Sequence, residues 1–221
     1  MSLTKPKLVV LISGGGTNLQ AIIDAIADGR LHAELAAVIS NKQDAFGLER
    51  GRTAGAAVRC VDHRQFADRD SFDAELMQVI DAFEPAMVIL AGFMRILTPG
   101  FVRHYQGKLL NIHPSLLPKY AGLNTHQRAL DAGESYHGAT VHFVTEELDG
   151  GPAILQASVV VNKNDTALTL ASKVLEKEHE IYPAAIQWCL TGKAKLTDGV
   201  VHLDDQILPK SGTQWNNEDR H

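Results

Sequence analysis

The opening of the chain combines a short aliphatic run, a glycine turn and a helical pattern. Residues 7–12 form an apolar run of strand length, and the sequence SGGGTN over 13–18 interrupts it. Apolar residues at helical spacing follow over 19–27. A strand, a glycine turn and a helix in this order begin a doubly wound α/β fold. The sequence therefore predicts a Rossmann-like, mostly parallel sheet covered by helices.

Strand and helix patterns keep alternating as far as His113. The run over 87–91 is apolar throughout, which is typical of a central parallel strand covered on both faces. The pattern over 70–83 is strongly amphipathic, and Thr98 followed by Pro99 is a common helix start. The remaining elements predicted here are strands over 34–40 and 56–61, a strand ending at His113, and a helix over 44–55 capped by Asp44.

The alternation stops after Pro118, and the second half follows a different pattern. A short helix is expected over 124–132. Residues 138–144 alternate apolar and polar side chains, and a second strand pattern covers 153–161. Because only a turn-rich loop separates these two strands, we expect them to form an antiparallel hairpin.

A long helical pattern closes the structured part of the chain. It covers 166–190 and contains Pro183, where we expect a kink or a break. An edge strand is expected over 200–203, and the polar stretch 209–221 predicts a disordered tail. No internal repeat or low-complexity linker divides the chain, so the sequence predicts one domain over 1–221.

Composition excludes several classes of protein. The 221 residues carry a net charge of −5, which argues against a general nucleic-acid surface. The longest apolar runs are too short to cross a bilayer, so no membrane association is expected. The two cysteines, Cys60 and Cys189, lack metal-ligand or redox spacing, which fits a reducing cytoplasm. Since no histidine has zinc-ligand spacing with a cysteine or carboxylate, we expect no metal.

The glycine turn is a candidate phosphate site. Successive backbone N–H groups at a helix N-terminus bind anions, and Gly16, Thr17 and Asn18 lie at that position. The turn is not a dinucleotide fingerprint, because Leu19 occupies the place of the third glycine. The alternative is a tight turn without a ligand. We favour phosphate binding, because turns of this kind are so commonly used for it.

A polar pair follows the strand that ends at His113. Asn111 and His113 are two residues apart, so an extended chain places both side chains on one face. Taken alone, Asn111 would be a turn residue, His113 a structural histidine and Asp149 a turn aspartate. Taken together, Asp149 could orient and charge the His113 imidazole. His142 alternates with apolar residues and is expected on a solvated or hydrogen-bonded sheet face.

Two further stretches have both a structural and a functional interpretation. Residues 91–97 carry apolar side chains and one arginine directly after the central strand. They suit a flat aromatic ligand with a carboxylate, and simple loop packing is an equal alternative. Glu178 and Glu180 lie on the long helix, where most glutamates are solvated. At most one of the two can point into a cleft, because residues two apart do not share a helix face.

The combination of these stretches resembles a known family. The stretch NIHPSLLP over 111–118, the later LDGGP over 148–152, the glycine turn, SNK over 40–42 and residues 90–97 are similar to the phosphoribosylglycinamide formyltransferases (GAR transformylases). This is a family of folate-dependent transferases of one-carbon metabolism and purine biosynthesis. The resemblance runs over nearly the whole chain. It implies a phosphate-binding Rossmann-like half over 1–108 and a catalytic half over 109–205 that completes the folate cleft.

The resemblance also implies roles for individual residues. The catalytic residues would be Asn111, His113 and Asp149, and Glu178 would contact the glycinamide amine. Gly16, Thr17 and Asn18 would bind the substrate phosphate. The folate-binding residues would be Arg69, Met94, Arg95, Ile96, Leu97, Asn111, Glu146, Glu147 and Leu148. The formyl donor implied is 10-formyltetrahydrofolate, the acceptor is glycinamide ribonucleotide, and the protein would be a cytoplasmic monomer or homodimer.

Two residues depart from the family pattern. Gly15 stands where another residue, often asparagine, is expected, so the phosphate loop could be looser. Asn124 stands where histidine is expected, which puts a substrate contact there in doubt. Neither departure touches Asn111, His113 or Asp149.

Three alternative functions follow from the same residues. Methionyl-tRNA formyltransferases and formyltetrahydrofolate hydrolases share the motifs but carry a further domain, which this sequence does not show. A nucleotide-sensing module without catalysis would use the glycine turn alone. That last alternative predicts that Asn111, His113 and Asp149 do not converge.

Overall fold

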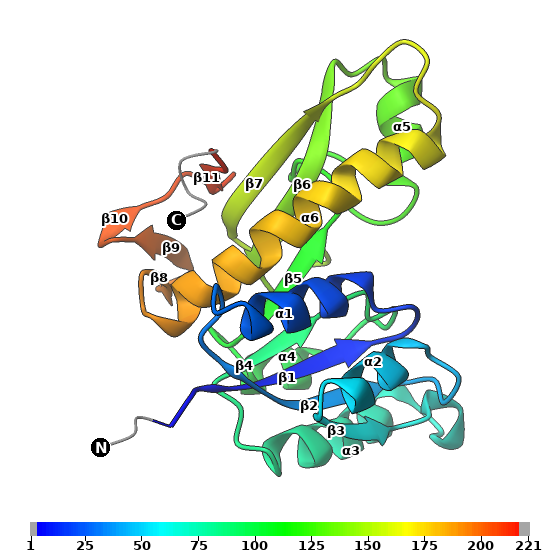
Figure 1. Ribbon diagram of the computed structural model, residues 1–221, viewed down its shortest axis with the longest axis vertical. Helices are drawn as coiled ribbons and strands as arrows, with labels where there is room; N and C mark the ends of the chain where they lie inside the picture. The colour runs from blue at the N-terminus through cyan, green and yellow to red at the C-terminus, as the bar shows by residue number, and fades with distance from the viewer. Residues whose placement is uncertain (1–3, 217–221) are drawn as a thin grey trace. The chain divides into compact units, whose positions relative to one another are not determined.

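The structure is a computed structural model that describes residues 4–216. The chain divides into two compact units, residues 1–110 and 111–221, and the division falls within the strand β5 (Leu109–His113). Figure 1 colours the first unit from blue to green and the second from green to red. Both units mix helices and strands, so the predicted α/β fold class is confirmed.

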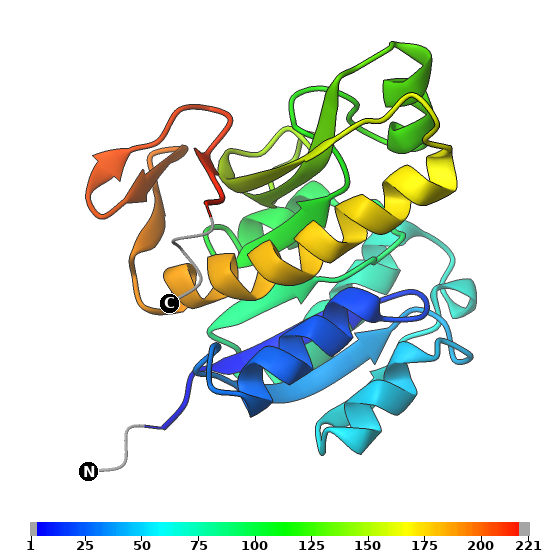
Figure 2. The same ribbon diagram turned by 45° about the horizontal axis from the view of Figure 1, so that its top comes forward.

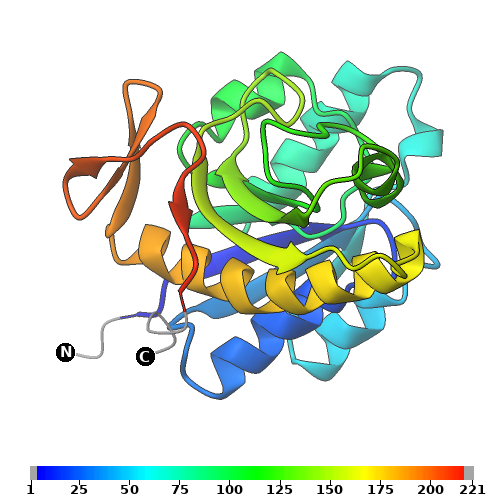
Figure 3. The same cartoon turned by 90° about the horizontal axis from the view of Figure 1, so that it is seen from above.

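The first unit is a parallel sheet with helices on both faces. Strand β1 pairs in parallel with β2 and with β4, and β2 pairs in parallel with β3. Figure 3 shows α1 and α2 on one face of this sheet and α3 and α4 on the other. The elements are β1 (Lys7–Ile12), α1 (Thr17–Ala27), β2 (Glu34–Ser40), α2 (Gly47–Thr53), β3 (Ala57–Cys60), a 3-10 turn (His63–Gln65), α3 (Arg69–Asp81), β4 (Met87–Leu90) and α4 (Pro99–His104).

Local signals explain most of these boundaries. All four residues of β4 are buried, as expected for an apolar strand covered on both faces. The Thr98 hydroxyl accepts a hydrogen bond from Phe101 N at the start of α4, and Pro99 occupies the first turn. Helix α3 begins in the same way, because the Asp68 side chain accepts from Ser71 N. The bounds predicted for β2 are confirmed.

The expected helix over 44–55 is wrong at its start. Helix α2 begins at Gly47, and Asp44 lies in the turn before it. Gly47 N donates to Gly14 O at 3.0 Å, and a Cβ built at Gly16 would lie 2.9 Å from Gly47 Cα. The helix therefore starts where its backbone touches the glycine turn. That contact depends on tertiary packing and leaves no signal in local propensity.

The second unit contains the expected antiparallel hairpin. Strands β6 (Tyr136–Phe143) and β7 (Ala153–Val160) pair antiparallel, and the strand order is β11-β7-β6-β5. Helix α6 (Ala167–Leu190) runs along this hairpin in Figures 1 and 2 and packs against both strands. The remaining elements are α5 (Thr125–Asp131), β8 (Ala194–Thr197), β9 (Val200–Leu203), β10 (Gln206–Ile207) and β11 (Thr213–Gln214).

Two expectations for this unit, a break at Pro183 and an edge strand over 200–203, are corrected. Helix α6 continues through the buried Pro183, so the alternative of a break there is wrong. Strand β9 is the middle strand of an antiparallel sheet with β8 and β10, rather than an edge strand. Strands β8 and β9 are joined by the turn Asp198-Gly199, where both residues have positive φ, as a tight two-residue hairpin turn requires.

The expected disordered tail contains a strand. β11 pairs in parallel with β7, and Trp215 N donates to Gln156 O at 2.7 Å. The rest of that predicted tail, residues 217–221, lies outside the described residues. Within residues 4–216, none of the helices has the length and apolar character needed to span a membrane.

Candidate active site

The end of β5 places His113 against Asp149. Buried residues Leu109 and Leu110 fix the strand, which ends at His113 before Pro114 removes the next backbone donor. His113 Nδ1 lies 3.4 Å from Asp149 Oδ2, and the two side chains are 8% and 9% exposed. The structure therefore brings together an imidazole and a carboxylate that are far apart in the sequence, in a site almost closed to water.

The other ring nitrogen of His113 also has a partner. His113 Nε2 lies 2.9 Å from the carbonyl oxygen of Tyr120, which can only accept a hydrogen bond. Both ring nitrogens thus face oxygen acceptors: Nε2 lies within hydrogen-bonding distance of the Tyr120 carbonyl, and Nδ1 lies at ion-pair distance from Asp149 Oδ2. Nε2, the ring nitrogen directed away from Asp149, is thus engaged with the Tyr120 carbonyl in this structure.

Asp149 lies in the loop between β6 and β7, in the left-handed region with φ 51°. Its Oδ2 accepts a hydrogen bond from Gly122 N at 2.8 Å in addition to facing His113. Gly151, which follows it, is required by close packing, because a Cβ there would clash with the carbonyl oxygen of Phe143. The left-handed backbone at Asp149 and the close approach of Gly151 to Phe143 accompany the placement of the carboxylate 3.4 Å from the His113 imidazole.

His142 is a site residue whose role sequence reasoning left open. Its ring is 2% exposed, and Nδ1 lies 2.9 Å from Phe143 O while Nε2 lies 3.2 Å from Asn111 Nδ2. Because a carbonyl only accepts, Nδ1 donates and Nε2 accepts from the Asn111 amide. Burial lowers the pKa of His142, which favours this neutral form. Of the two alternatives considered for His142, the hydrogen-bonded sheet face is confirmed.

This contact fixes the orientation of Asn111. One N–H of its amide is held by His142, so the second N–H and the Oδ1 atom point elsewhere. Asn111 is half-buried at the strand end, whereas its neighbour Ile112 is buried. Asn111 can therefore present a donor that does not rotate freely, which is what stabilisation of a developing negative charge needs.

The remaining histidines differ in environment. His104 is exposed and bonds Asp81 at 2.8 Å, as expected for a surface residue. His126 is half-buried, with its ring 5.2 Å from that of His137. Burial lowers the pKa of the 1% exposed His137 to about 4. Among the described residues, no cluster of three histidine, cysteine or acidic side chains is arranged to hold a metal.

Glu178 and Glu180 lie in different environments on α6. Glu178 is buried, with 7% of its surface exposed. Glu180 contacts Lys177 at 3.2 Å and accepts from Trp215 Nε1 at 3.1 Å. The predicted difference between the two faces is confirmed, and Glu178 is the one placed inside the protein. In the β6–β7 loop, Glu146, Glu147 and Leu148 are exposed.

The glycine turn in the first unit leads directly into α1. Gly16 has φ 71°, Thr17 is the exposed first residue of the helix, and Asn18 is 9% exposed. The predicted strand, turn and helix are confirmed, and the helix N-terminus they create is the geometry that binds anions. Since the helix has 11 residues, its dipole supports that site.

Arg50 is a neighbour of this turn that sequence reasoning did not single out. Its Nε donates to Gly15 O at 2.8 Å, and its Nη1 donates to Gln20 Oε1 at 2.8 Å. The guanidinium thus holds the turn and adds positive charge beside it. This contact ties to α2 the backbone at Gly15, where the family pattern has another residue. The only sequence signal was the position of Arg50 on α2, one strand and one helix further along the chain.

The segment after β4 exposes apolar side chains. Met94 and Ile96 are 68% and 61% exposed, although Phe93 beside them is buried. The Arg95 guanidinium lies 5.8 Å from the centre of the Phe72 ring. Arg69 is exposed at the first position of α3. Exposed apolar residues next to a positioned arginine suit an aromatic ligand with a carboxylate.

The chain is similar to known proteins in sequence and in structure. The sequence pattern of the family described as "Formyl transferase" matches residues 6–186. Phosphoribosylglycinamide formyltransferase of Escherichia coli (strain K12) is 53% identical over 205 residues, which cover 93% of this chain and 97% of that protein. The Haemophilus influenzae protein of the same name is 47% identical over 206 residues, with coverage of 93% and 97%.

A solved structure agrees with these sequence relatives. Phosphoribosylglycinamide formyltransferase from Coxiella burnetii, in complex with CHES, superposes with a TM-score of 0.93 at 48% sequence identity. The match covers 96% of this chain and 100% of that chain. Because the family pattern spans most of the sequence and the relatives are matched over nearly their whole length, the chain belongs to the formyl transferase family.

Proposed function

We propose that the protein transfers the formyl group of 10-formyltetrahydrofolate to the primary amine of glycinamide ribonucleotide. The products are formylglycinamide ribonucleotide and tetrahydrofolate, in de novo purine biosynthesis. Relatives that bear the name of this activity are 53% and 47% identical to the chain. The single observation that carries the proposal is the contact of His113 with Asp149 at the end of β5, at 3.4 Å.

In the proposed mechanism the amine attacks the formyl carbon, and negative charge develops on the formyl oxygen. The free N–H of Asn111 and a protonated His113 donate hydrogen bonds to that oxygen. Asp149 stabilises the imidazolium and helps a water molecule move a proton from the attacking nitrogen to the folate leaving nitrogen. A preorganised donor of this type is typically worth ~10²–10³ in rate. The mechanism needs no covalent enzyme intermediate.

His113 can act on the formyl oxygen only if the Tyr120 carbonyl moves away from Nε2, from its present distance of 2.9 Å. Tyr120 lies in an irregular stretch before α5, with φ 58°. Asp149 contacts this stretch as well, through Gly122 N. We infer that the substrate oxygen replaces the Tyr120 carbonyl as the acceptor for Nε2, while the Asp149 contact at Nδ1 is kept.

Binding roles are proposed for each unit by itself. In the first unit, Gly16, Thr17 and Asn18 bind the phosphate of glycinamide ribonucleotide through the N-terminus of α1. The folate-binding residues of that unit are Arg69, Met94, Arg95, Ile96 and Leu97. In the second unit, Glu178 contacts the glycinamide amine, and Asn111, Glu146, Glu147 and Leu148 contact the folate. The exposed apolar side chains of Met94, Ile96 and Leu148 support these assignments.

The test is a formyl-transfer assay with purified protein, glycinamide ribonucleotide and 10-formyltetrahydrofolate. We expect turnover by the wild type and loss of most of it in His113→Ala, with the fold retained. Release of formate without formylation of the amine would instead indicate a hydrolase. Near-normal turnover of His113→Ala would refute the catalytic role. A binding module without catalysis has no need for the His113–Asp149 contact, and it predicts no turnover at all.

The setting of the reaction is also proposed. Cys60 and Cys189 are free thiols, which fits the reducing cytoplasm. Burial raises the pKa of the Cys189 thiol to about 12, so this thiol is a poor nucleophile at neutral pH. We propose that the protein acts there as a monomer or a homodimer, which sedimentation analysis distinguishes.

A further inference from the structure

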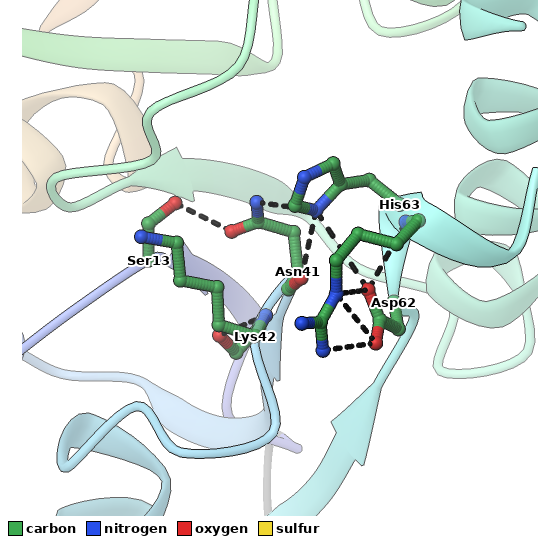
Figure 4. Close-up of polar contacts among 7 residues, drawn as sticks. Ser13, Asn41, Lys42, Asp62 and His63 are labelled. Atoms are coloured by element: carbon green, nitrogen blue, oxygen red, sulfur yellow. Dashed lines mark hydrogen bonds and ion pairs between the residues drawn. The ribbon is translucent and has the colours of Figure 1, made fainter.

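Buried polar side chains in the first unit form a connected network at the ends of β1 and β2. Ser13 Oγ lies 2.8 Å from Met94 N and 2.6 Å from Asn41 Oδ1. Asn41 Nδ2 lies 3.2 Å from His63 Nδ1. Ser13 and Asn41 are 6% and 1% exposed. Figure 4 shows Ser13, Asn41 and His63 joined in this order.

The direction of each hydrogen bond in this network follows from the Met94 backbone N–H, which can only donate. Met94 N–H can only donate, so Ser13 Oγ accepts from it and directs its own hydrogen to Asn41 Oδ1. The Asn41 amide is thereby oriented with its NH₂ toward His63, whose Nδ1 lies 3.2 Å from Asn41 Nδ2 and 3.1 Å from the Asn41 backbone oxygen. The Ser13 hydroxyl is therefore fixed from one side by Asn41 and fixes Met94 N on the other.

The opposite end of the same segment is held in a similar way. Thr98 N donates to Asp73 Oδ2 at 2.6 Å, and Asp73 is 1% exposed. Burial raises the pKa of Asp73, against the hydrogen bond from Thr98. The stretch from Met94 to Leu97 is thus held at both ends by buried side chains, Ser13 directly after β1 and Asp73 of α3. Between these ends the apolar groups of Met94 and Ile96 are exposed.

The hydrogen bond from Met94 N to Ser13 Oγ is a main constraint on the path of the irregular segment. The stretch 91–98 is irregular and includes Gly92 with φ 75°, so few local constraints fix its path. Ser13 N also donates to Gly92 O at 3.1 Å, so the residue directly after β1 contacts the irregular segment through both its backbone N–H and its hydroxyl. Removing the hydroxyl would leave Met94 N–H without its buried acceptor.

We propose that Ser13 is a positioning residue for folate binding, whose hydroxyl, oriented by Asn41, holds Met94 N so that Met94 and Ile96 present a preformed apolar surface to the folate. This inference rests on the proposed function, because it assigns the ligand of the segment from that function. A preformed surface binds more tightly because less ordering entropy is lost when the ligand binds. The effect is on binding of the folate and not on the chemical step.

The test is steady-state kinetics of Ser13→Ala with each substrate varied in turn. We expect the KM for 10-formyltetrahydrofolate to rise about tenfold, equivalent to about 1.4 kcal/mol, with kcat and the KM for glycinamide ribonucleotide nearly unchanged. Ser13→Thr retains the hydroxyl and is expected to restore the folate KM. Asn41→Ala keeps the acceptor for Met94 N but releases its orientation, so an intermediate rise in the folate KM is expected.

The matched control is Ser40→Ala. Ser40 is a fully buried serine at the end of the neighbouring strand β2, and its Oγ accepts from Lys42 N at 3.0 Å. It loses a similar hydrogen bond without touching the Met94 segment, so its folate KM should stay at the wild-type value. Equal folate KM values for Ser13→Ala and Ser40→Ala would overturn the proposal. If Ser13→Ala does not fold, an unchanged folate KM in Asn41→Ala would overturn it instead.

A further variant separates this proposal from the assignment of the segment itself. Ile96→Ser removes exposed apolar surface from the segment and leaves Ser13 intact. A raised folate KM in Ile96→Ser with none in Ser13→Ala would reject the positioning role alone. If neither variant changes the folate KM, the folate-binding segment is assigned wrongly and the positioning role falls with it.

Discussion

Replacing Asp149 by asparagine removes one negative charge and almost nothing else. Asparagine has the same shape, and its Oδ1 can still accept the hydrogen bond from Gly122 N, which is 2.8 Å long in the wild type. Asparagine also tolerates the left-handed backbone at φ 51° that residue 149 adopts. Alanine at this position would add a backbone cost of about 1–2 kcal/mol. Asp149→Asn is therefore the cleaner test of the proposed catalytic role.

The geometry sets the size of the effect. His113 Nδ1 and Asp149 Oδ2 are 3.4 Å apart, and both side chains are more than nine-tenths buried. At an effective dielectric constant of about 20, opposite charges at that separation attract by roughly 5 kcal/mol. In Asp149→Asn, the asparagine dipole and water replace part of this attraction energy. We expect the loss to approach that of an oxyanion donor, ~10²–10³ in kcat or about 3–4 kcal/mol.

The assay compares kcat with the thermal stability of the same protein. Asp149→Asn should lower kcat by the stated factor, while Tm changes by no more than about 2–4 °C, equivalent to about 1 kcal/mol. The control is Asp165→Asn, because Asp165 also accepts from a backbone N–H and pairs with a cation, Lys173, away from His113. A kcat of Asp149→Asn within about twofold of that of Asp165→Asn would refute the reasoning, since no catalytic charge would then have been removed.

Two further predictions concern stability. Gly16→Ala should lower the free energy of unfolding, measured in urea, by roughly 2–4 kcal/mol, because φ is 71° and the new Cβ would lie 2.9 Å from Gly47 Cα. Gly15→Ala is the control. No described heavy atom lies within 4 Å of a Cβ at Gly15, so this variant should change the free energy of unfolding by less than about 1 kcal/mol. The pKa of His137 is about 4 in the folded protein against an ordinary value of 6.5. Between these two pH values the unfolded chain binds more protons than the folded protein, so the free energy of unfolding should fall as the pH drops from 6.5 to about 4. His137→Gln should flatten this decline in denaturation curves measured at several pH values, and an unchanged slope would contradict the assignment.

The elements that were predicted well depend on short-range patterns. The bounds of β2, the cap at Thr98 and the β6–β7 hairpin follow from the alternation of side chains and from capping chemistry, which neighbouring residues determine. The errors occur where distant residues decide. Helix α2 starts at Gly47 because its backbone meets the glycine turn, and the chain after Pro209 forms β11 because the edge of β7 can accept it. The Asp198-Gly199 hairpin was visible in the sequence as a turn signal and was missed.

The candidate active site shows the same division. The sequence alone places Asn111 and His113 on one face of a strand, since side chains two apart in an extended chain point the same way. It also supplies Gly151, whose missing Cβ lets the Asp149 loop pass close to the Phe143 carbonyl. Only the tertiary structure decides that Asp149 reaches His113, that His142 holds one N–H of Asn111, and that the Tyr120 carbonyl engages His113 Nε2. Periodicity assigns a residue to a face, whereas the partner across that face is set by strand pairing and loop paths, and these depend on the packing of the whole unit.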